Sequence, residues 1–143
     1  MKLRLLMLGK TRRPEIRGLL DDYVSRIRHY AAIEITELRE ASAAALRKCK
    51  LDPAAVVVLL DAAGKSFTTP ELARWLGRHR DSGLRELVFL CGDADGFPHE
   101  FRAAAREKIS LSPLTMPHEF ARVLLAEQLY RAFTILHGHP YSK

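Results

Sequence analysis

The sequence predicts an α/β fold with a mostly parallel sheet flanked by helices. Apolar runs of strand length alternate with amphipathic stretches of helix length along the chain. Two of the runs, residues 55–60 and 87–91, are apolar throughout, which is typical of central strands buried on both faces. The 143 residues suit one domain of ordinary size, and no internal repeat, low-complexity tract or linker divides them. We therefore expect a single domain over residues 1–143.

The first half of the chain opens with an apolar run that resembles a short signal peptide. Arg4 interrupts this run and no small-residue cleavage site follows it, so a buried first strand is the better interpretation. The next apolar residues recur at helical spacing, and a later stretch alternates as a half-exposed strand does. The elements expected here are a strand at residues 3–8, a basic loop at 9–14, a helix at 15–30, an alternating strand at 33–38 and a short helix at 41–50.

The second half of the chain contains the clearest helix boundaries. Thr69 is expected to cap a helix that has Pro70 in its first turn. The last helix has Pro117 in its first turn, and it ends where Gly138 caps it and Pro140 stops it. Between these two helices, the pattern predicts the strand at 87–91, a helix at 97–107 and a short strand at 109–111.

The last helix has an unusually broad apolar face. Burial against more than one surface is therefore expected, and a subunit interface is one candidate. The charged residues are expected on its polar side, where Glu127 precedes Arg131 by four residues, a favourable ion-pair spacing. A solvated salt bridge is the ordinary interpretation, and an arginine that faces RNA phosphate is the alternative. The apolar set is Phe120, Val123, Leu124, Leu125, Leu129, Ala132, Phe133 and Leu136, and the polar set is Arg122, Glu127 and Arg131.

Charge and cysteine content narrow the class of protein. The net charge of +6 permits a polyanionic partner but says nothing about base chemistry.

Neither Cys49 nor Cys91 has a C-x-x-C partner, so a disulfide framework or a zinc site is not expected, and Cys91 is expected to be a core thiol. The cytoplasm is then the default compartment. No apolar run approaches the roughly 20 residues that span a bilayer, so no membrane partner is expected.

One glycine-containing segment resembles a phosphate-binding P-loop but lacks a glycine that the motif requires. Gly64-Lys65-Ser66 follows a strand and resembles the end of a phosphate-binding P-loop. That motif needs a glycine five residues before the Gly-Lys pair, and this position is Leu59. The segment is therefore interpreted as a turn.

Two further segments follow strands and leave their roles open. Residues 92–96 carry glycines that allow a ligand to approach the backbone, or that simply make a tight turn. Asp93 and Asp95 lie there without a third ligand, so no metal site is expected. Residues 111–116 can offer backbone groups to the edge of a flat heterocycle, although general physics favours Thr115 as a helix cap.

The tail carries His137, His139 and Tyr141, a composition unlike a typical disordered end.

Several motifs occur together in a specific order. Residues 110–118 read SLSPLTMPH, residues 122–132 read RVLLAEQLYRA, and the tail contains Pro140-Tyr141. The pattern extends to Met1-Lys2-Leu3, to Leu60-Asp61 with Gly64-Lys65, and to Gly92 with Gly96. It covers nearly the whole chain and resembles the RlmH family of SPOUT-class ribosomal RNA methyltransferases.

The resemblance implies a reaction, a fold and an assembly. It implies methylation from S-adenosylmethionine at N3 of a pseudouridine in large-subunit ribosomal RNA, on the assembled ribosome. It implies a SPOUT fold with a C-terminal trefoil knot, an exception to unknotted topology, and a homodimer with the cofactor held in the knot. No metal is required, because the cofactor carries its own electrophile and the protein mainly positions and desolvates the reactants.

The resemblance also assigns residues to the site. Arg131 and Tyr141 are expected on the substrate side. His139 is the candidate acceptor of the N3 proton, because Ser142 stands where the family usually has a histidine. The cofactor is expected at Leu60, Gly92, Leu111, Ser112, Pro113, Leu114, Thr115 and Met116.

Two departures from the family pattern keep other functions open. Asp93 stands where the family usually has a second glycine, and Ser142 replaces the tail histidine. A catalytically impaired ribosome-binding relative is therefore the alternative to an active enzyme. A flavodoxin-like small-ligand domain, without a knot, is a third hypothesis.

Overall fold

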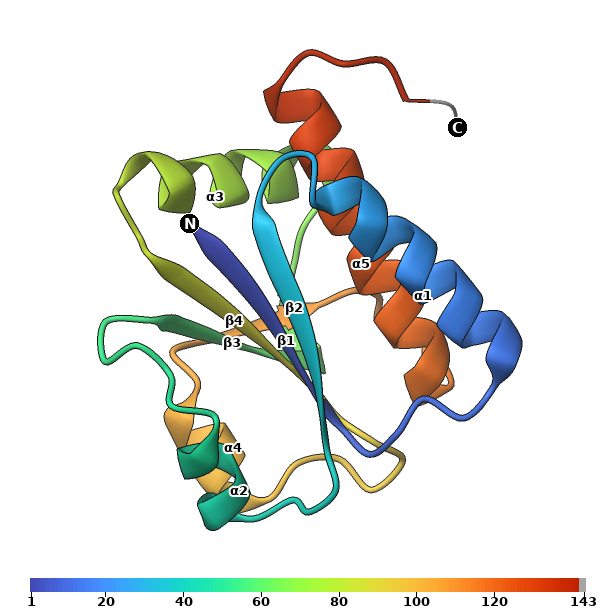
Figure 1. Cartoon of the computed structure of the whole chain (residues 1–143), viewed down its shortest axis with the longest axis vertical. Coiled ribbons are helices and arrows are strands. Elements are labelled where there is room, and N and C mark those ends of the chain that lie inside the picture. Colours follow the sequence, from blue (N-terminus) through green and yellow to red (C-terminus); the bar gives the residue numbers. More distant parts are fainter. Residues whose placement is uncertain (142–143) are drawn as a thin grey trace.

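The computed structural model describes residues 1–141, in which five strands form a single all-parallel sheet (Figure 1). The strand order is β2-β1-β4-β3-β5, so the apolar runs predicted as central strands do lie inside the sheet. The strands are β1 (Lys2–Leu8), β2 (Ala32–Leu38), β3 (Val56–Ser66), β4 (Glu86–Cys91) and β5 (Glu107–Ser110), and the helices are α1 (Pro14–Ile27), α2 (Ala43–Lys48), α3 (Thr69–Asp81), α4 (His99–Ala104) and α5 (His118–Leu136).

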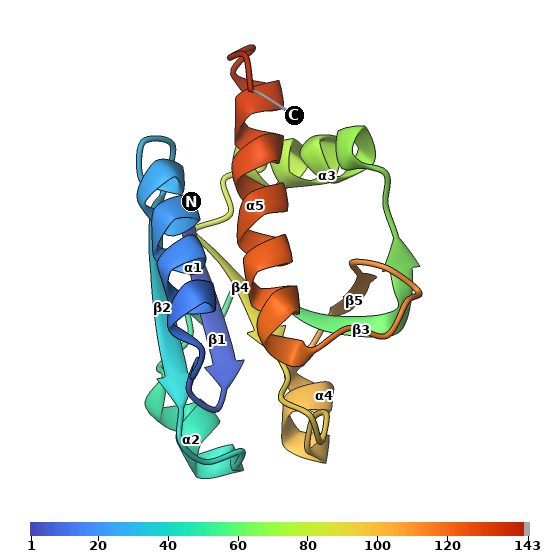
Figure 2. The ribbon, with the colours of Figure 1, turned by 90° about the vertical axis from the view of Figure 1, so that its right-hand side faces the viewer.

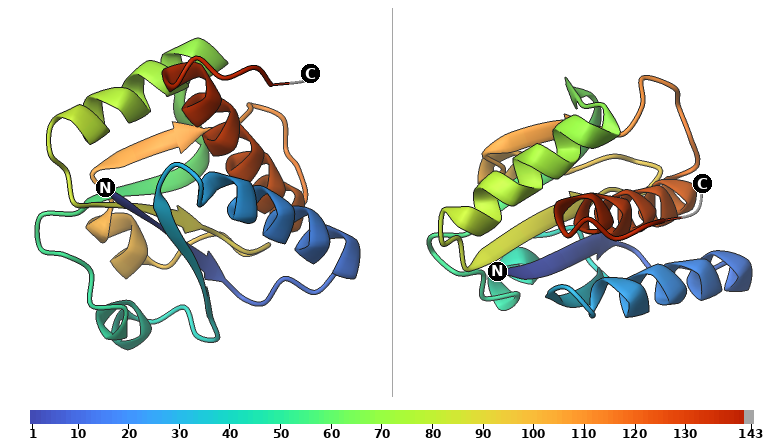
Figure 3. Two further views of the ribbon diagram at one scale, coloured as in Figure 1. Left: turned by 45° about the horizontal axis from the view of Figure 1, so that its top comes forward. Right: turned by 90° about the horizontal axis from the view of Figure 1, so that it is seen from above.

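Helices cover both faces of the sheet, as the α/β prediction requires. One face carries α1, α3 and α5, with α5 between the other two (Figure 2; Figure 3, right). The opposite face carries the shorter α2 and α4. Alternate residues of β1 enter the two cores: Leu5 faces the α5 side, and Leu6 faces the α4 side. The predicted fold class is therefore confirmed.

Three helices are shorter than predicted, and tertiary contacts explain one of them. Helix α1 ends at Ile27 rather than at residue 30, α2 spans six residues rather than ten, and α4 spans six residues rather than eleven. After α4 the backbone is extended at Ala105, and the N–H of Arg106 donates to the carbonyl of Val57, 2.9 Å away. Sheet pairing therefore takes over from the helix before the apolar pattern ends.

The segment predicted as a turn at residues 64–66 is instead part of β3. After an irregularity between Leu60 and Lys65, the strand pairs again with β5, with Lys65 opposite Ile109. A Cβ on Gly64 would lie 2.7 Å from the carbonyl carbon of Lys108, so only glycine permits this approach of two backbones. The turn prediction was wrong because a lone glycine in a strand looks locally like a turn.

Helix caps differ from the prediction by one or two residues. Thr68, not Thr69, caps α3: its hydroxyl accepts the N–H of Glu71, whose carboxylate accepts the N–H of Thr68. Helix α5 begins after Pro117, so Thr115 does not cap it. Gly138 follows the C-cap with a φ of 66°, as predicted for the end of α5.

The apolar face of α5 is divided between the core of the chain and the exposed surface. Leu125 and Leu129 lie in the core of the single chain with exposed fractions of 2% and 0%, so they are not free to face a second copy. Phe120, Leu124 and Ile135 remain exposed on the same helix. Within residues 1–141, no helix is both long enough and apolar enough to cross a membrane.

Candidate cofactor and substrate site

The carboxyl ends of β4 and β5, together with the irregular middle of β3 between them, bring the predicted cofactor residues to one edge of the sheet. Leu59 is paired with Leu90, so Leu60 lies beside the end of β4, directly before Gly92. Leu60 is also paired with Ile109, which places Leu111 just beyond the same edge. Ligands in open parallel sheets bind at this kind of edge.

A hollow of about 210 Å³ lies between the middle of β3, the segment after β5 and the start of α5; we call it the cofactor hollow because most of the residues predicted for the cofactor line it. Six of the eight predicted cofactor residues line it, together with three others. Gly92 and Pro113 do not line it; Gly92 lies at the same edge, where a Cβ would be 3.2 Å from the ring of Phe97. The lining residues are Leu60, Asp61, Ala62, Leu111, Ser112, Leu114, Thr115, Met116 and Ala121.

The polar groups of this hollow are largely engaged in local turns. The Ser112 hydroxyl accepts the N–H of Leu114 at 3.0 Å. Asp61 accepts the N–H of Ala63 at 2.9 Å and pairs with Arg102 at 3.2 Å. These two partners, the N–H first, hold the pKa of the Asp61 carboxyl below its usual value, so the group is charged at neutral pH. The pairing of Asp61 with Arg102 was not predicted, since 41 residues separate them.

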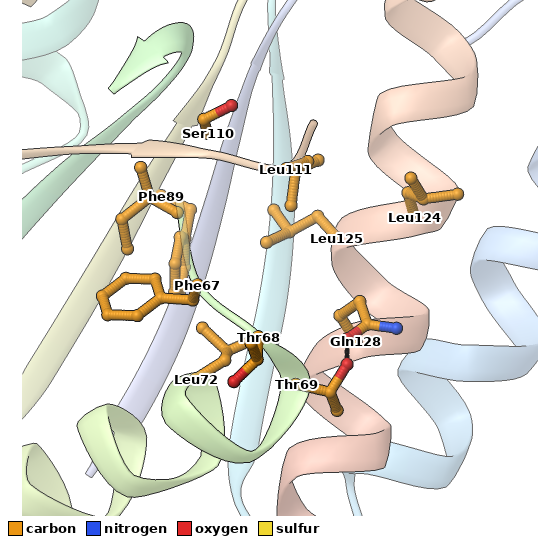
Figure 4. A pocket seen from close by; sticks show the side chains of 11 residues that line it. Phe67, Thr68, Thr69, Leu72, Phe89, Ser110, Leu111, Leu124, Leu125 and Gln128 are labelled. Carbon is orange, nitrogen blue, oxygen red and sulfur yellow. Dashed lines mark hydrogen bonds between the residues drawn. The ribbon is translucent and has the colours of Figure 1, made fainter. Parts of the chain in front are cut away.

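A second hollow, of about 220 Å³, shares Leu111 with the first and lies between β5, α5 and the start of α3 (Figure 4). Its walls are mostly apolar, including Phe67, Leu72 and Leu125. The Thr69 hydroxyl donates to the side-chain oxygen of Gln128 across it, at 2.8 Å. The two hollows therefore lie on either side of Leu111.

The tail folds back onto α5, where it forms a cluster around one carboxylate. Glu127 Oε2 accepts from Nη2 of Arg131 at 2.6 Å and from the hydroxyl of Tyr141 at 2.9 Å. The guanidinium of Arg131 lies 4.4 Å from the centroid of the Tyr141 ring. Burial and the Glu127 carboxylate both raise the pKa of Tyr141, so its hydroxyl stays protonated. The predicted pair of Glu127 and Arg131 forms, and it holds the tail.

His139 completes this region through a contact with Tyr30, in the turn between α1 and β2. Its Nδ1 lies 2.7 Å from the hydroxyl of Tyr30, whose ring stacks on Phe133 at 5.6 Å. His139, Arg131 and Tyr141 line one hollow of about 530 Å³, so the three residues predicted on the substrate side do lie together. Arg131 is ten residues after Ala121 on α5, which puts this cluster about 15 Å along the helix from the cofactor hollow.

The two departures from the family pattern have different outcomes. The Asp93 carboxylate accepts the N–H of Asp95 at 2.9 Å and so closes its own turn. It does not line the cofactor hollow. Ser142 lies outside the described residues. Across residues 1–141, no group of three His, Cys, Asp or Glu side chains is placed to hold a metal ion.

Arg122 is the residue that the sequence placed wrongly. It was expected on the polar side of α5, but its side chain is completely buried. Nη1 donates to the hydroxyl of Thr11 and Nη2 to the carbonyl of Leu8, both at 2.7 Å. Burial lowers the pKa of this guanidinium, and it raises the pKa of the neighbouring Cys91 thiol to about 12, so Cys91 is the inert core thiol that was expected.

The whole chain matches one family of known proteins. Residues 1–142 match the family model described as "Predicted SPOUT methyltransferase". The chain belongs to the SPOUT methyltransferase family.

Several relatives of this SPOUT chain have the same name. It is 46% identical to the ribosomal RNA large subunit methyltransferase H of Geobacter sp. (strain M21), over 99% of this chain and 98% of the relative. It is 45% identical to the protein of the same name from Koribacter versatilis (strain Ellin345), over 99% of this chain and 97% of the relative.

Solved structures share the SPOUT fold at low sequence identity. A probable methyltransferase from Bordetella pertussis Tohama I has a TM-score of 0.60 at 14% identity, over 92% of this chain and 95% of that protein. The SpoU methyltransferase AviRb from Streptomyces viridochromogenes, solved in complex with AdoMet, has a TM-score of 0.53 at 13% identity, over 91% of this chain and 57% of that protein. These likenesses bear on the fold alone.

Proposed function

We propose that this SPOUT protein transfers a methyl group from S-adenosylmethionine to large-subunit ribosomal RNA. The observation that carries the proposal is the 46% identity, along nearly the full length of both chains, to an enzyme named for that reaction. The site agrees with it, because residues from the irregular middle of β3 and the segment that follows β5 meet in one hollow at the edge of the sheet.

The residues of the cofactor hollow fit part of S-adenosylmethionine. Apolar walls from Leu60, Leu111 and Met116 suit the two faces of an adenine ring. At about 210 Å³ the hollow is smaller than a site that encloses a whole drug-sized ligand, so the rest of the cofactor extends along the edge toward Gly92. The group, when bound, supplies the electrophilic methyl carbon, and the chain has to place the acceptor nitrogen in line with it.

The acceptor that we propose is N3 of a pseudouridine on the assembled ribosome, as the RlmH resemblance implies. Arg131 would orient the base through the N–H groups that Glu127 leaves free, and Tyr141 through its ring and its hydroxyl oxygen as an acceptor, with Glu127 holding both side chains in place. His139 would accept the N3 proton at Nε2. That role requires Nδ1 to carry its own hydrogen and donate it to Tyr30, because a hydroxyl that donates to Nδ1 would leave the proton on Nε2.

We further propose that the enzyme is a homodimer. Within one chain the cluster of Arg131, His139 and Tyr141 lies about 15 Å from the cofactor hollow, too far for a methyl group to pass directly between them. A second copy would bring its tail to this chain's cofactor hollow. The exposed side chains of Leu124 and Ile135 on α5 are the apolar surface available for the contact. Light scattering at micromolar concentration should give twice the 16.2 kDa of one chain; a mass of one chain would exclude the dimer.

The remaining expectations belong to the same proposal. The enzyme works as a single SPOUT domain over residues 1–143, with a trefoil knot in its C-terminal part. Its substrate places it in the cytoplasm, with ribosomes.

A two-step experiment tests the function. Titration calorimetry with S-adenosylmethionine should give one site per subunit, and labelled cofactor should methylate large ribosomal subunits from cells that lack this gene. Mass mapping of the RNA then identifies the modified nucleotide. Binding of subunits without any methyl transfer would establish the impaired relative instead, and no heat of binding at millimolar cofactor would exclude the enzyme.

A further inference from the structure

The loop between β1 and α1 presents cations that have no ionic partner. Lys10, Arg12 and Arg13 have exposed side chains, and within residues 1–141 none of the three forms a salt bridge. By contrast, most of the other arginines form salt bridges with carboxylates. These are Arg4, Arg17, Arg26, Arg80, Arg85, Arg102, Arg122 and Arg131.

Carboxylates do contact this loop, but they bind its backbone rather than its cations. Glu119 Oε1 accepts the N–H of Arg12 at 3.2 Å and the N–H of Arg13 at 3.1 Å. Glu37 accepts the N–H of Thr11 at 2.6 Å. Burial raises the pKa of both carboxyls, but these N–H groups and nearby arginines outweigh it and hold each pKa below its usual value. Both groups are therefore ionised acceptors at neutral pH.

Buried Arg122 holds the loop from beneath. It donates to the Thr11 hydroxyl and to the carbonyl of Leu8, the last residue of β1. The backbone is thus anchored by α5 and β2, while the cationic side chains point to solvent. Side chains on a fixed backbone lose less entropy when they bind a partner.

Two neighbours extend this basic surface. Arg39 is exposed, and it lines one hollow with Lys10 beside the end of β2. The guanidinium of Arg13 lies 5.5 Å from the centroid of the exposed Phe120 ring, which supports it by a cation–π contact. The acidic side chains of this region include Glu37 and Glu119, already bound to the loop, Asp93, whose charge acts on Arg122 beneath it, and the exposed Glu15 and Glu40, which neighbour the basic residues in sequence.

The basic surface lies one helix width from the cofactor hollow. The start of α5 separates the two: Glu119 holds the loop, whereas Met116 and Ala121 line the hollow. An α-helix with its side chains is about 10–12 Å across. Any polyanion that the loop holds therefore lies next to the place where the acceptor base must enter.

We infer that Lys10, Arg12, Arg13 and Arg39 form a phosphate-binding surface that sets the backbone of the substrate RNA beside the cofactor hollow. This inference rests on the proposed function. Guanidinium groups bind phosphate oxygens in a bidentate way, and such contacts fix the register of a nucleic acid without reading its sequence. The tail cluster of Arg131 and Tyr141 would then act on the base, and the loop on the backbone.

The test compares two double variants with the same loss of charge. R12Q/R13Q removes two cations from the loop. R28Q/R78Q removes two exposed arginines near the C-terminal ends of α1 and α3, at the opposite edge of the sheet. The probe is the large ribosomal subunit from cells that lack this gene, with binding measured by co-sedimentation between 50 and 200 mM KCl. Methylation gives KM and kcat, and calorimetry gives the affinity for S-adenosylmethionine.

R12Q/R13Q should lower the slope of log affinity against log salt by about 2, roughly one for each phosphate contact. Across this salt range, wild type should then lose about tenfold more affinity than R12Q/R13Q loses. KM should rise, while kcat at saturating subunits and the affinity for the cofactor stay at wild-type values. R28Q/R78Q should match wild type in all of these measurements.

The outcomes separate this inference from the proposed function. If R12Q/R13Q methylates with wild-type KM and salt dependence, or changes no more than R28Q/R78Q, the phosphate-binding surface is wrong and the enzyme stands. If wild type binds subunits with a salt slope that R12Q/R13Q loses, yet transfers no methyl group, the surface stands and the enzyme is wrong.

Discussion

Arg122 and Arg131 lie nine residues apart on α5, yet they have opposite roles. Arg122 has no exposed surface, and it joins the helix to the end of β1 and to the basic loop. Arg131 keeps a quarter of its side chain exposed, and with Glu127 it holds the tail tyrosine. The first arginine therefore belongs to the core, and the second belongs to the proposed substrate site. The role of an arginine on a helix is assigned by what its side chain contacts, because the charge of the side chain is the same in both cases.

The replacement Arg122→Ala should have the largest effect on stability. It leaves a cavity and deprives the Leu8 carbonyl and the Thr11 hydroxyl of their donor, at a cost of roughly 3–5 kcal/mol of the free energy of unfolding. Urea unfolding followed by circular dichroism measures this. A loss below about 1 kcal/mol would contradict the assignment of Arg122 to the core.

The replacement Arg131→Ala should have the opposite profile. A partly exposed ion pair contributes at most about 1 kcal/mol, so stability should change little. Single-turnover methylation of large ribosomal subunits should fall by about 100-fold, as when one donor is removed from a preorganised site. Equal rates for Arg131→Ala and wild type, per folded molecule, would remove Arg131 from the site.

The replacement Tyr141→Phe refines the comparison at the tail. It keeps the ring against Arg131 and removes only the hydroxyl that donates to Glu127, so we expect a rate about tenfold lower with an unchanged melting temperature. His139→Ala, measured in parallel, tests the proton acceptor. If Tyr141→Phe is as active as wild type while His139→Ala is inactive, the tyrosine only covers apolar surface and the histidine carries the tail's role.

The smallest expected effect is on the free energy of unfolding at acid pH, through the carboxylates that anchor the loop between β1 and α1. The pKa values of Glu37 and Glu119 are lowered in the folded protein, so their contribution to stability is complete above the unfolded value near 4.5 and is lost as pH falls below it. Wild type should therefore lose its stability advantage over Glu119→Gln as pH falls from about 4.5 through the lowered pKa of Glu119 in the folded protein. A constant difference in free energy of unfolding between the two proteins across that range would show that the Glu119 charge contributes nothing.

The sequence by itself predicted the elements whose signals are local. Residues 87–91 are apolar throughout and form β4, one of the inner strands. The i,i+4 spacing of Glu127 and Arg131 predicted their ion pair, and the order of motifs predicted the segment that lines the cofactor hollow. Apolar periodicity and short-range spacing suffice for these features because each depends on residues close together in the chain.

Only the tertiary structure decided the features that depend on distant partners. Gly64 lies in a strand because the backbone of Lys108 passes too close for any side chain. Arg122 can be buried because the fold brings to it two acceptors that lie more than 110 residues earlier in the chain. Tyr141 reaches Glu127 because the tail turns back after Gly138. The free energy of burying a charge or a backbone group is set by the partners that the fold supplies, and no pattern within a few residues records them.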